Sequence, residues 1–119
     1  MDQFSFTKYE HEVLPNFRQK ISKAESTEDV KKFFVYSAKE LLEKVFEGKM
    51  NIRYEDFLLL PDAEPPFELS ERLFACEDLR SVWVVSDLPR MMYRLAESAI
   101  HRHRHLEKHR EKTDAKIRM

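Results

Sequence analysis

Apolar side chains recur at steps of three and four positions along most of the chain, which is the spacing of one face of an α-helix. The first such face covers residues 4–24 and is interrupted by Pro15. A proline inside a helix removes a backbone hydrogen bond and clashes with the preceding turn. We therefore expect either a kink at this point or two short helices that meet at Leu14.

The clearest helical pattern follows this first segment. Ser26, with Asp29 three positions later, is typical of a helix start. The apolar stripe beyond it is wide, so we predict a helix over residues 28–47 that contacts two neighbouring elements, as a helix inside a bundle does. Gly48, the only glycine of the chain, stands where a residue with a left-handed backbone commonly ends a helix.

The middle of the chain has the least regular pattern. Tyr54, Phe57 and Leu58 allow a short helix that ends before Pro61, and the prolines in residues 61–66 then require an extended or turn connection. Ser70 is placed to begin the next helix, which we extend through residues 82–85. That last run is rich in β-branched residues and could form a strand, but no second segment of similar quality exists to pair with it.

The last helix is predicted to start at Asp87, because Pro89 then falls in the first turn, where its missing N–H costs nothing. We expect it to run from residue 88 to about residue 112. Its apolar face thins beyond Ile100, so the helix should extend past the core on which it packs, and its end should fray.

These segments together predict an all-α fold, an irregular bundle of four to five helices with a long C-terminal helix extending past the core. The length of 119 residues suits one domain, which we place at residues 1–112, followed by a frayed or disordered tail at residues 113–119. The single glycine supports this class, because hairpin turns and phosphate-binding loops commonly need glycine.

The charges balance over the whole chain but are unevenly distributed. Residues 54–88 hold 2 basic and 9 acidic side chains, whereas residues 89–119 hold 9 basic and 4 acidic ones. Such blocks can complement each other within the fold or between subunits, or they can face different partners.

Cysteine content and the longest apolar runs restrict the cellular context. Cys76 is the only cysteine, which excludes an internal disulfide and a cysteine-based zinc cluster within one chain. No apolar run approaches the ~18 residues that cross a bilayer, and the first residues lack the features of a signal peptide. We therefore expect a soluble cytoplasmic protein that does not bind membranes.

The segment HRHRHLEKHR, residues 101–110, carries the most distinctive candidate chemistry. At ~100° per residue, His101, His105 and His109 form one stripe beside the apolar face, while His103 lies on the other flank. Two imidazoles at this spacing can bind one zinc, nickel or copper ion, so these three histidines are candidate metal ligands. One straight helix rarely supplies more than two ligands to an ion, and the alternative is a solvated helix face.

The same segment holds candidate contacts to a partner or to nucleic acid, namely Arg102, Arg104, Lys108 and Arg110, which could neutralise phosphates. The nucleic-acid hypothesis is weakened by the acidic residues of the same block. It is weakened further because no aromatic residue is interleaved with the basic ones to stack on bases.

No catalytic constellation or phosphate-binding loop is recognisable, so we favour a non-enzymatic role. Our main expectation is a small helical protein-interaction module that acts as a homodimer or as a subunit of a larger assembly. Two alternatives remain open at this point: a metal-binding protein that uses the histidine stripe, and a nucleic-acid-binding protein that uses the basic end.

Overall fold

The computed structural model describes the backbone of residues 5–117 and the side chains of residues 5–108. This part of the chain is mostly helical, with five α-helices, one short 3-10 helix and one two-stranded sheet. In chain order the elements are α1 (Thr7–Ser22), α2 (Thr27–Val45), η1 (Tyr54–Asp56), β1 (Phe57–Leu59), β2 (Phe67–Leu69), α3 (Glu71–Phe74), α4 (Glu77–Val85) and α5 (Leu88–Ile117). The predicted helical class is confirmed, whereas the all-α description is only approximate.

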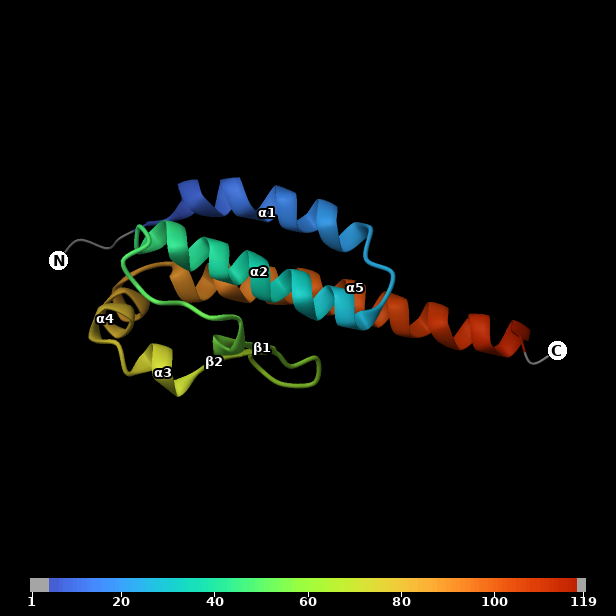
Figure 1. Cartoon of the computed structure of the whole chain (residues 1–119). Coiled ribbons are helices and arrows are strands. Elements are labelled where there is room, and N and C mark those ends of the chain that lie inside the picture. Colours follow the sequence, from blue (N-terminus) through green and yellow to red (C-terminus); the bar gives the residue numbers. More distant parts are fainter. Residues whose placement is uncertain (1–4, 118–119) are drawn as a thin grey trace.

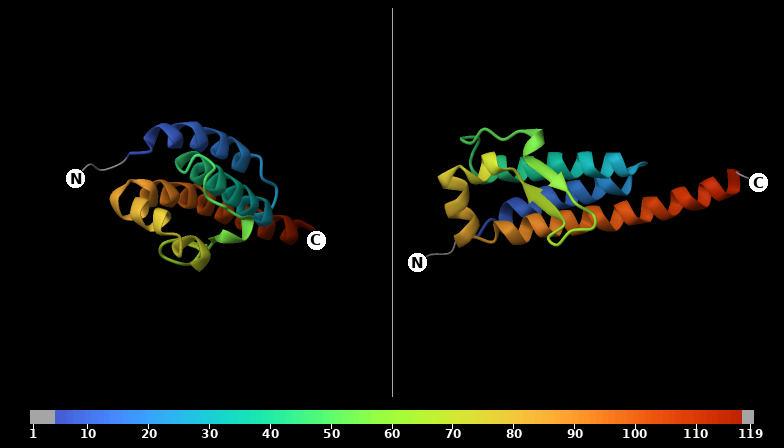
Figure 2. Two further views of the ribbon diagram at one scale, coloured as in Figure 1. Left: turned by 60° about the vertical axis from the view of Figure 1, so that its left-hand side comes forward. Right: turned by 90° about the horizontal axis from the view of Figure 1, so that it is seen from below.

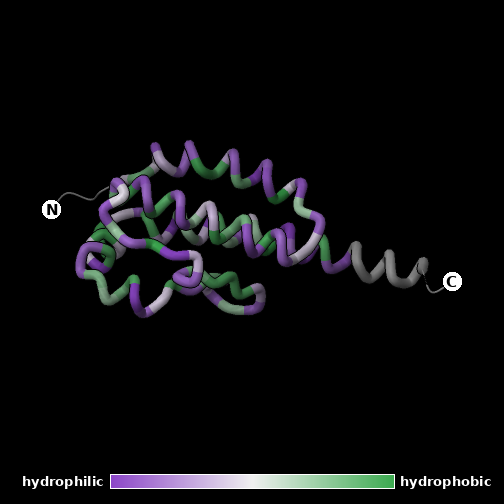
Figure 3. Tube along the Cα trace, viewed as in Figure 1, coloured by the Kyte–Doolittle hydropathy of each residue, from purple (hydrophilic) through white to green (hydrophobic). Residues whose placement is uncertain are grey.

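Three long helices form the body of the molecule. Helix α2 contacts both α1 and α5, and the hairpin of β1 and β2 packs against α2 on the side away from α1 (Figures 1 and 2). Hydrophilic and hydrophobic residues alternate along the turns of α1 and α2, as expected for amphipathic helices (Figure 3). The predicted two-sided contact of the second helix is therefore confirmed.

The core lies where these three helices meet. Its largest side chains are at most 2% exposed, and α1, α2 and α5 all contribute to them. Burial of a whole aliphatic or aromatic side chain contributes roughly 1.5–3 kcal/mol, so this cluster supplies most of the driving force for folding. The members of the cluster from α1, α2 and α5 include Phe17, Phe34, Leu41, Leu42, Met91, Met92 and Leu95.

Helix α1 continues through Pro15 as one element, so the two-helix alternative is wrong. Pro15 lies on the exposed side of the helix. The carbonyl group that loses its hydrogen bond one turn earlier can therefore be hydrated, which lowers the cost of the proline. The helix is gently arched rather than broken (Figure 1).

The predicted helix starts at Ser26 and Ser70 are confirmed. The hydroxyl oxygen of Ser26 accepts a hydrogen bond from the backbone N–H of Asp29 at 3.1 Å. Ser70 accepts one from the N–H of Leu73 at 3.2 Å. Each contact satisfies an N–H group that the helix itself leaves without a partner.

The segment after Ser70 differs from the prediction in one respect, because it forms two helices, α3 and α4, instead of one. Cys76 stands between them with an extended backbone and precedes Glu77 and Asp78 in the first turn of α4. Carboxylates are favourable at a helix start, which supports a second start at this position. Residues 82–85 are helical, as predicted.

The hairpin corrects the prediction of a short helix that includes Phe57 and Leu58. Only Tyr54–Asp56 forms a helical turn, and β1 then pairs antiparallel with β2, with Leu58 opposite Glu68. In each strand the outer two residues are buried and the middle one is exposed. Three residues are too few for a period of two to be recognised in a sequence, and the pairing joins segments that are not adjacent in the chain.

The C-terminus of α2 uses two residues with a left-handed backbone, Glu47 at φ 54° and Gly48 at φ 74°. The N–H of Gly48 donates to the carbonyl oxygen of Glu43 at 2.9 Å, and that of Glu47 donates to Lys44 at 3.4 Å, which is the Schellman pattern. The predicted left-handed backbone of Gly48 is confirmed, but Glu47 takes the position directly after the helix end and Gly48 follows it.

We expect Gly48→Ala to lower the free energy of unfolding by about 1 kcal/mol, because a left-handed backbone strains any residue with a Cβ atom. Alanine also restricts the unfolded chain, and this smaller stabilising effect offsets part of the loss. Urea unfolding followed by circular dichroism measures this loss. Lys32→Ala, at an exposed position on α2, is the matched control and should leave stability unchanged. A Gly48→Ala protein as stable as the original would contradict the assignment of this helix end.

Helix α5 starts directly after Asp87, as predicted, but the side chain of Asp87 serves another helix. Its carboxylate accepts hydrogen bonds from the N–H of Phe6 at 2.9 Å and from the hydroxyl of Ser5 at 2.9 Å. It therefore caps the start of α1, whose own first residues supply no side-chain cap. This contact joins the start of α1 to the start of α5.

The far end of α5 reaches Ile117 instead of ending at about residue 112. The helix projects beyond the rest of the molecule (Figure 1). Residues 118–119 lie outside the described part, and the division into a domain at 1–112 and a tail at 113–119 stays a prediction. Within the described residues, no helix is both long and apolar enough to cross a membrane.

Candidate functional site

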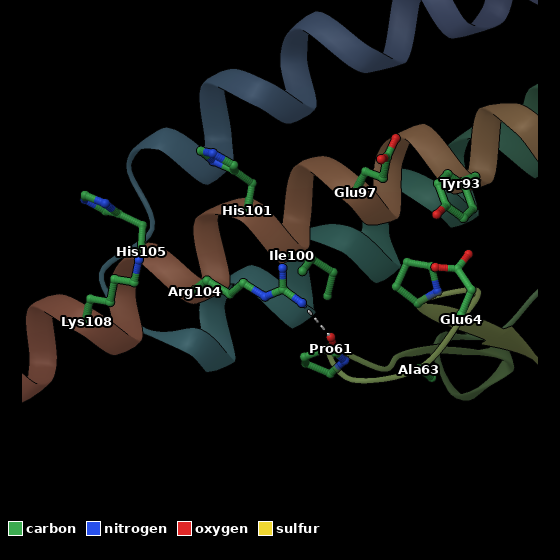
Figure 4. A pocket seen from close by; sticks show the side chains of 11 residues that line it. Pro61, Ala63, Glu64, Tyr93, Glu97, Ile100, His101, Arg104, His105 and Lys108 are labelled. Carbon is green, nitrogen blue, oxygen red and sulfur yellow. Dashed lines mark hydrogen bonds between the residues drawn. The ribbon is translucent and has the colours of Figure 1, made fainter.

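The predicted metal ligands lie on the part of α5 that leaves the body of the molecule. His101 and His105 are exposed and stand one turn apart. Both point away from the loop of residues 61–66 (Figure 4). The side chain of His109 lies outside the described residues. No three His, Cys, Asp or Glu side chains gather to hold a metal within the described part, so a metal site at this stripe stays a prediction.

The predicted partner contacts include two arginines that already bond to backbone carbonyl groups. Nη2 of Arg102 donates to the carbonyl oxygen of Ala24 at 2.9 Å, and Nη2 of Arg104 reaches that of Pro61 at 3.5 Å. These bonds tie α5 to the α1–α2 connection and to the loop after β1. Lys108 is exposed, and the side chain of Arg110 lies outside the described residues. Nucleic-acid binding by these residues stays a prediction.

His103 is the member of the segment that the sequence analysis placed on the other flank without a role. It is only 6% exposed. Its Nδ1 lies 2.8 Å from Oε1 of Glu107 one turn later, at an ion-pair distance without the geometry of a hydrogen bond. Its helical angle next to the apolar face was the signal for burial, so His103 belongs to the packing of α5.

A groove that the sequence analysis did not anticipate lies between the hairpin, α3 and α4, and we call it the aromatic groove. It encloses about 840 Å³. The ring centroid of Trp83 lies 5.6 Å from that of Phe74, with an angle of 86° between the ring planes. It lies 6.3 Å from the ring centroid of Phe67, with an angle of 69° between the planes. These are the edge-to-face contacts that aromatic rings prefer. The residues lining it are Leu60, Ala63, Glu64, Pro65, Phe67, Glu68, Leu69, Glu71, Phe74, Ala75 and Trp83.

The charges around the aromatic groove have one sign. Glu64, Glu68 and Glu71 are exposed on its walls, and none of the residues that line it is basic. The rest of the lining is apolar. A groove with an apolar floor and acidic walls is suited to an apolar segment that carries positive charges.

A second hollow, of about 510 Å³, lies on the other side of the same loop, against α5 (Figure 4). Its charges are mixed, with Glu64 and Glu97 towards one end and Arg104 and Lys108 towards the other. A hydrogen bond to the Glu64 carboxylate, with a smaller contribution from desolvation, raises the pKa of the Tyr93 phenol above its ordinary value. Because acidic and basic groups are both present, this hollow has no clear preference for a charged ligand.

The aromatic groove could not be recognised from spacing in the sequence. Trp83 is half-buried and lines the groove. Its two aromatic partners belong to β2 and α3, and only the hairpin brings β2 to this place. The one available signal was the acidic block at residues 54–88, which includes all three glutamates of the groove.

Comparison of the chain with protein-family models, with curated proteins and with solved structures gave no match.

Proposed function

We propose that this protein is an interaction module that self-associates, with the projecting end of α5 of one copy lying in the aromatic groove of another. The observation that carries this proposal is the pairing of an aromatic floor with purely acidic walls in that groove. Partly buried aromatic side chains that line a groove are typical of protein-binding surfaces, where such residues supply much of the affinity.

The same chain supplies a segment of the matching charge. The last well-buried side chains of α5 are Ile100 and His103, and Leu106 is half-buried. The helix continues beyond these residues to Ile117, away from the body of the molecule (Figure 2). Residues 107–119, which follow Leu106, hold 5 basic and 3 acidic side chains. A helix that lays such a segment into a groove is a common mode of recognition.

If the helix end of each copy lies in the groove of the other, the expected assembly is a closed dimer. Each copy carries one groove and one projecting helix end, so two copies related by a two-fold axis can satisfy both contacts at once. The acidic walls then meet basic residues across the interface. Opposite charges at an interface speed the encounter of the partners and select against wrong partners.

The only tryptophan of the chain, Trp83, reports directly on the groove. We expect a synthetic peptide of residues 107–119 to change its fluorescence in a saturable manner, and added salt to weaken the binding. Sedimentation velocity over a range of protein concentrations should show a monomer–dimer equilibrium.

Charge reversal tests the contact itself. Glu68→Lys with Glu71→Lys should weaken dimerisation and peptide binding by about tenfold or more, since like charges then face each other. Glu25→Lys with Glu40→Lys is the matched control, because it changes the net charge equally at exposed positions outside the groove. A protein that stays monomeric and shows no fluorescence response to the peptide would overturn the proposal, as would equal loss in the control.

A further inference from the structure

A third hollow lies on the α1 side of α5, and we call it the basic hollow. It encloses about 310 Å³. Its polar lining consists of Arg18 and Ser22 from α1 with Ser98, His101, Arg102 and His105 from α5. It is separate from the aromatic groove, and the two share no lining residue.

The charges of the basic hollow also have one sign, and it is positive. None of the residues that line it is a carboxylate, whereas two are arginines, two are histidines and two carry hydroxyl groups. Arg18 is exposed and makes no hydrogen bond or ion pair with any described residue. Two guanidinium groups without a facing carboxylate repel each other unless an anion lies between them.

Arg102 gives a second, independent indication of a missing partner. One end of its guanidinium donates to the carbonyl oxygen of Ala24 at 2.9 Å. Its Nε is buried and has no hydrogen-bond acceptor. Buried donors nearly always have a partner, so an orphaned one beside a hollow calls for an acceptor that the chain itself does not supply.

The end of α1 does not cancel this positive charge. Carbonyl groups at a helix C-terminus usually disfavour an anion. Here those of Lys20 and Ile21 accept from the N–H groups of Lys23 and Ala24, each at 3.1 Å, and that of Ala24 accepts from Arg102. The carbonyl dipoles nearest the hollow are therefore already satisfied.

The histidine stripe acquires a different meaning in this setting. The imidazole rings of His101 and His105 point towards the α1 side of α5 (Figure 4). Both residues line the basic hollow as well as the hollow of mixed charge on the loop side. Beside Arg18 and Arg102, a divalent cation would be repelled, whereas an anion would be attracted. Imidazole N–H groups and the Ser98 hydroxyl can donate hydrogen bonds to an oxyanion, whereas the Ser22 hydroxyl already donates to the carbonyl oxygen of Gln19 at 2.7 Å.

We infer that the basic hollow binds a phosphate-type oxyanion, either free phosphate or a phosphomonoester. Arginine presents several N–H donors in a planar fork that matches phosphate oxygens, and such charge-assisted bonds are the strong ones. The hollow is larger than one phosphate group, so the molecule that carries the group can also be accommodated.

Titration of the isotope-labelled full chain with inorganic phosphate, followed by NMR, tests the site. The amide signals of Arg18, Ser22, Ser98 and His101 should shift and reach saturation, while sodium chloride at equal ionic strength should not reproduce the effect. Arg18→Gln should weaken phosphate binding by about tenfold or more. Arg80→Gln, at an exposed position on α4 outside the hollow, is the matched control and should leave binding unchanged.

The same titration with phosphoserine distinguishes the source of the phosphate. Tighter binding of phosphoserine than of inorganic phosphate indicates a phosphomonoester, and equal binding indicates free phosphate. His101→Gln, also at an exposed position, is a second variant expected to weaken binding. Shifts that stay linear in phosphate, or equal weakening by Arg80→Gln, overturn the inference.

This test is independent of the proposed self-association. The variant with Glu68→Lys and Glu71→Lys should still bind phosphate, because neither residue lines the basic hollow.

Discussion

Replacing Asp56 by asparagine should lower the free energy of unfolding by about 3 kcal/mol, the largest loss that we expect from a single polar substitution in this protein. Asp56 is 3% exposed. Its carboxylate accepts from the N–H of Arg53 at 2.7 Å, the hydroxyl of Ser70 at 2.7 Å and Nε of Arg72 at 3.1 Å, and it forms an ion pair with Nη2 of Arg72. An amide can accept at only one of its two positions, so buried donors would lose their partner.

These bonds explain why one residue matters so much to the fold. Asp56 ends η1 just before β1, Ser70 follows β2, and Arg72 lies in α3. Its backbone carbonyl also accepts from the N–H of Ser70 at 2.9 Å. Asp56 therefore joins the start of the hairpin to its end, and the aromatic groove depends on that junction.

The stabilising effect of Asp56 should depend on pH in a defined direction. Burial alone would raise its pKa, but hydrogen bonds from Arg72, Ser70 and the Arg53 backbone, with the charge of Arg72, lower the pKa below 3.8. A group whose pKa is lowered on folding contributes fully above its unfolded pKa and loses that contribution as the pH falls through its folded pKa. The difference between the original protein and Asp56→Asn should therefore be complete near neutral pH and shrink below about pH 4.

Urea unfolding of both proteins at several pH values measures the loss and its pH dependence. Glu55→Gln is the matched control, because Glu55 is the adjacent acidic residue and is exposed. Its side chain makes no hydrogen bond or ion pair with any other described residue. If Asp56→Asn were as stable as Glu55→Gln at neutral pH, the central role of this carboxylate would be refuted.

The second large effect is expected at the ion pair between α1 and α5. Oε1 of Glu10 lies 2.7 Å from Nη1 of Arg94. The Glu10 side chain is 5% exposed, that of Arg94 is 47% exposed, and Oε2 of Glu10 has no hydrogen-bond partner. Removal of Arg94 therefore leaves a buried charge that water cannot reach, whereas removal of Glu10 leaves a charge that water can hydrate.

Arg94→Met should destabilise the protein by about 2–3 kcal/mol, because it leaves a buried carboxylate without a counter-charge. Glu10→Met should cost less than about 1 kcal/mol, because the remaining arginine can be hydrated and the methionine fills a similar volume. The double variant should resemble Glu10→Met, since the unpaired charge is then absent.

Thermal or urea unfolding of the three variants measures this asymmetry. The comparison between the two single variants serves as its own control, because each removes the same ion pair. Equal losses for Arg94→Met and Glu10→Met would show that burial of the carboxylate is not the dominant cost.

The histidine segment shows how far sequence reasoning reached at the candidate sites. Helical spacing correctly put His101 and His105 on one stripe, since angles around a helix follow from position alone. It could not identify what faces that stripe. Arg18 and Ser22 of α1 complete the basic hollow, and they lie far away in the chain. With them the same two histidines belong to the anion site that we propose, and a metal site at the stripe stays a prediction.

Local sequence patterns were sufficient to predict the long helices and most of their ends. Apolar spacing, the serine caps and Gly48 act within a few residues along the chain, so helices α1, α2 and α5 could be predicted without knowing the fold. The hairpin, the hydrogen bonds of Asp56 and the three hollows arise only from tertiary contacts. Each of these depends on segments that meet only after the chain has folded, and the free energy of such contacts has no periodic trace in the sequence.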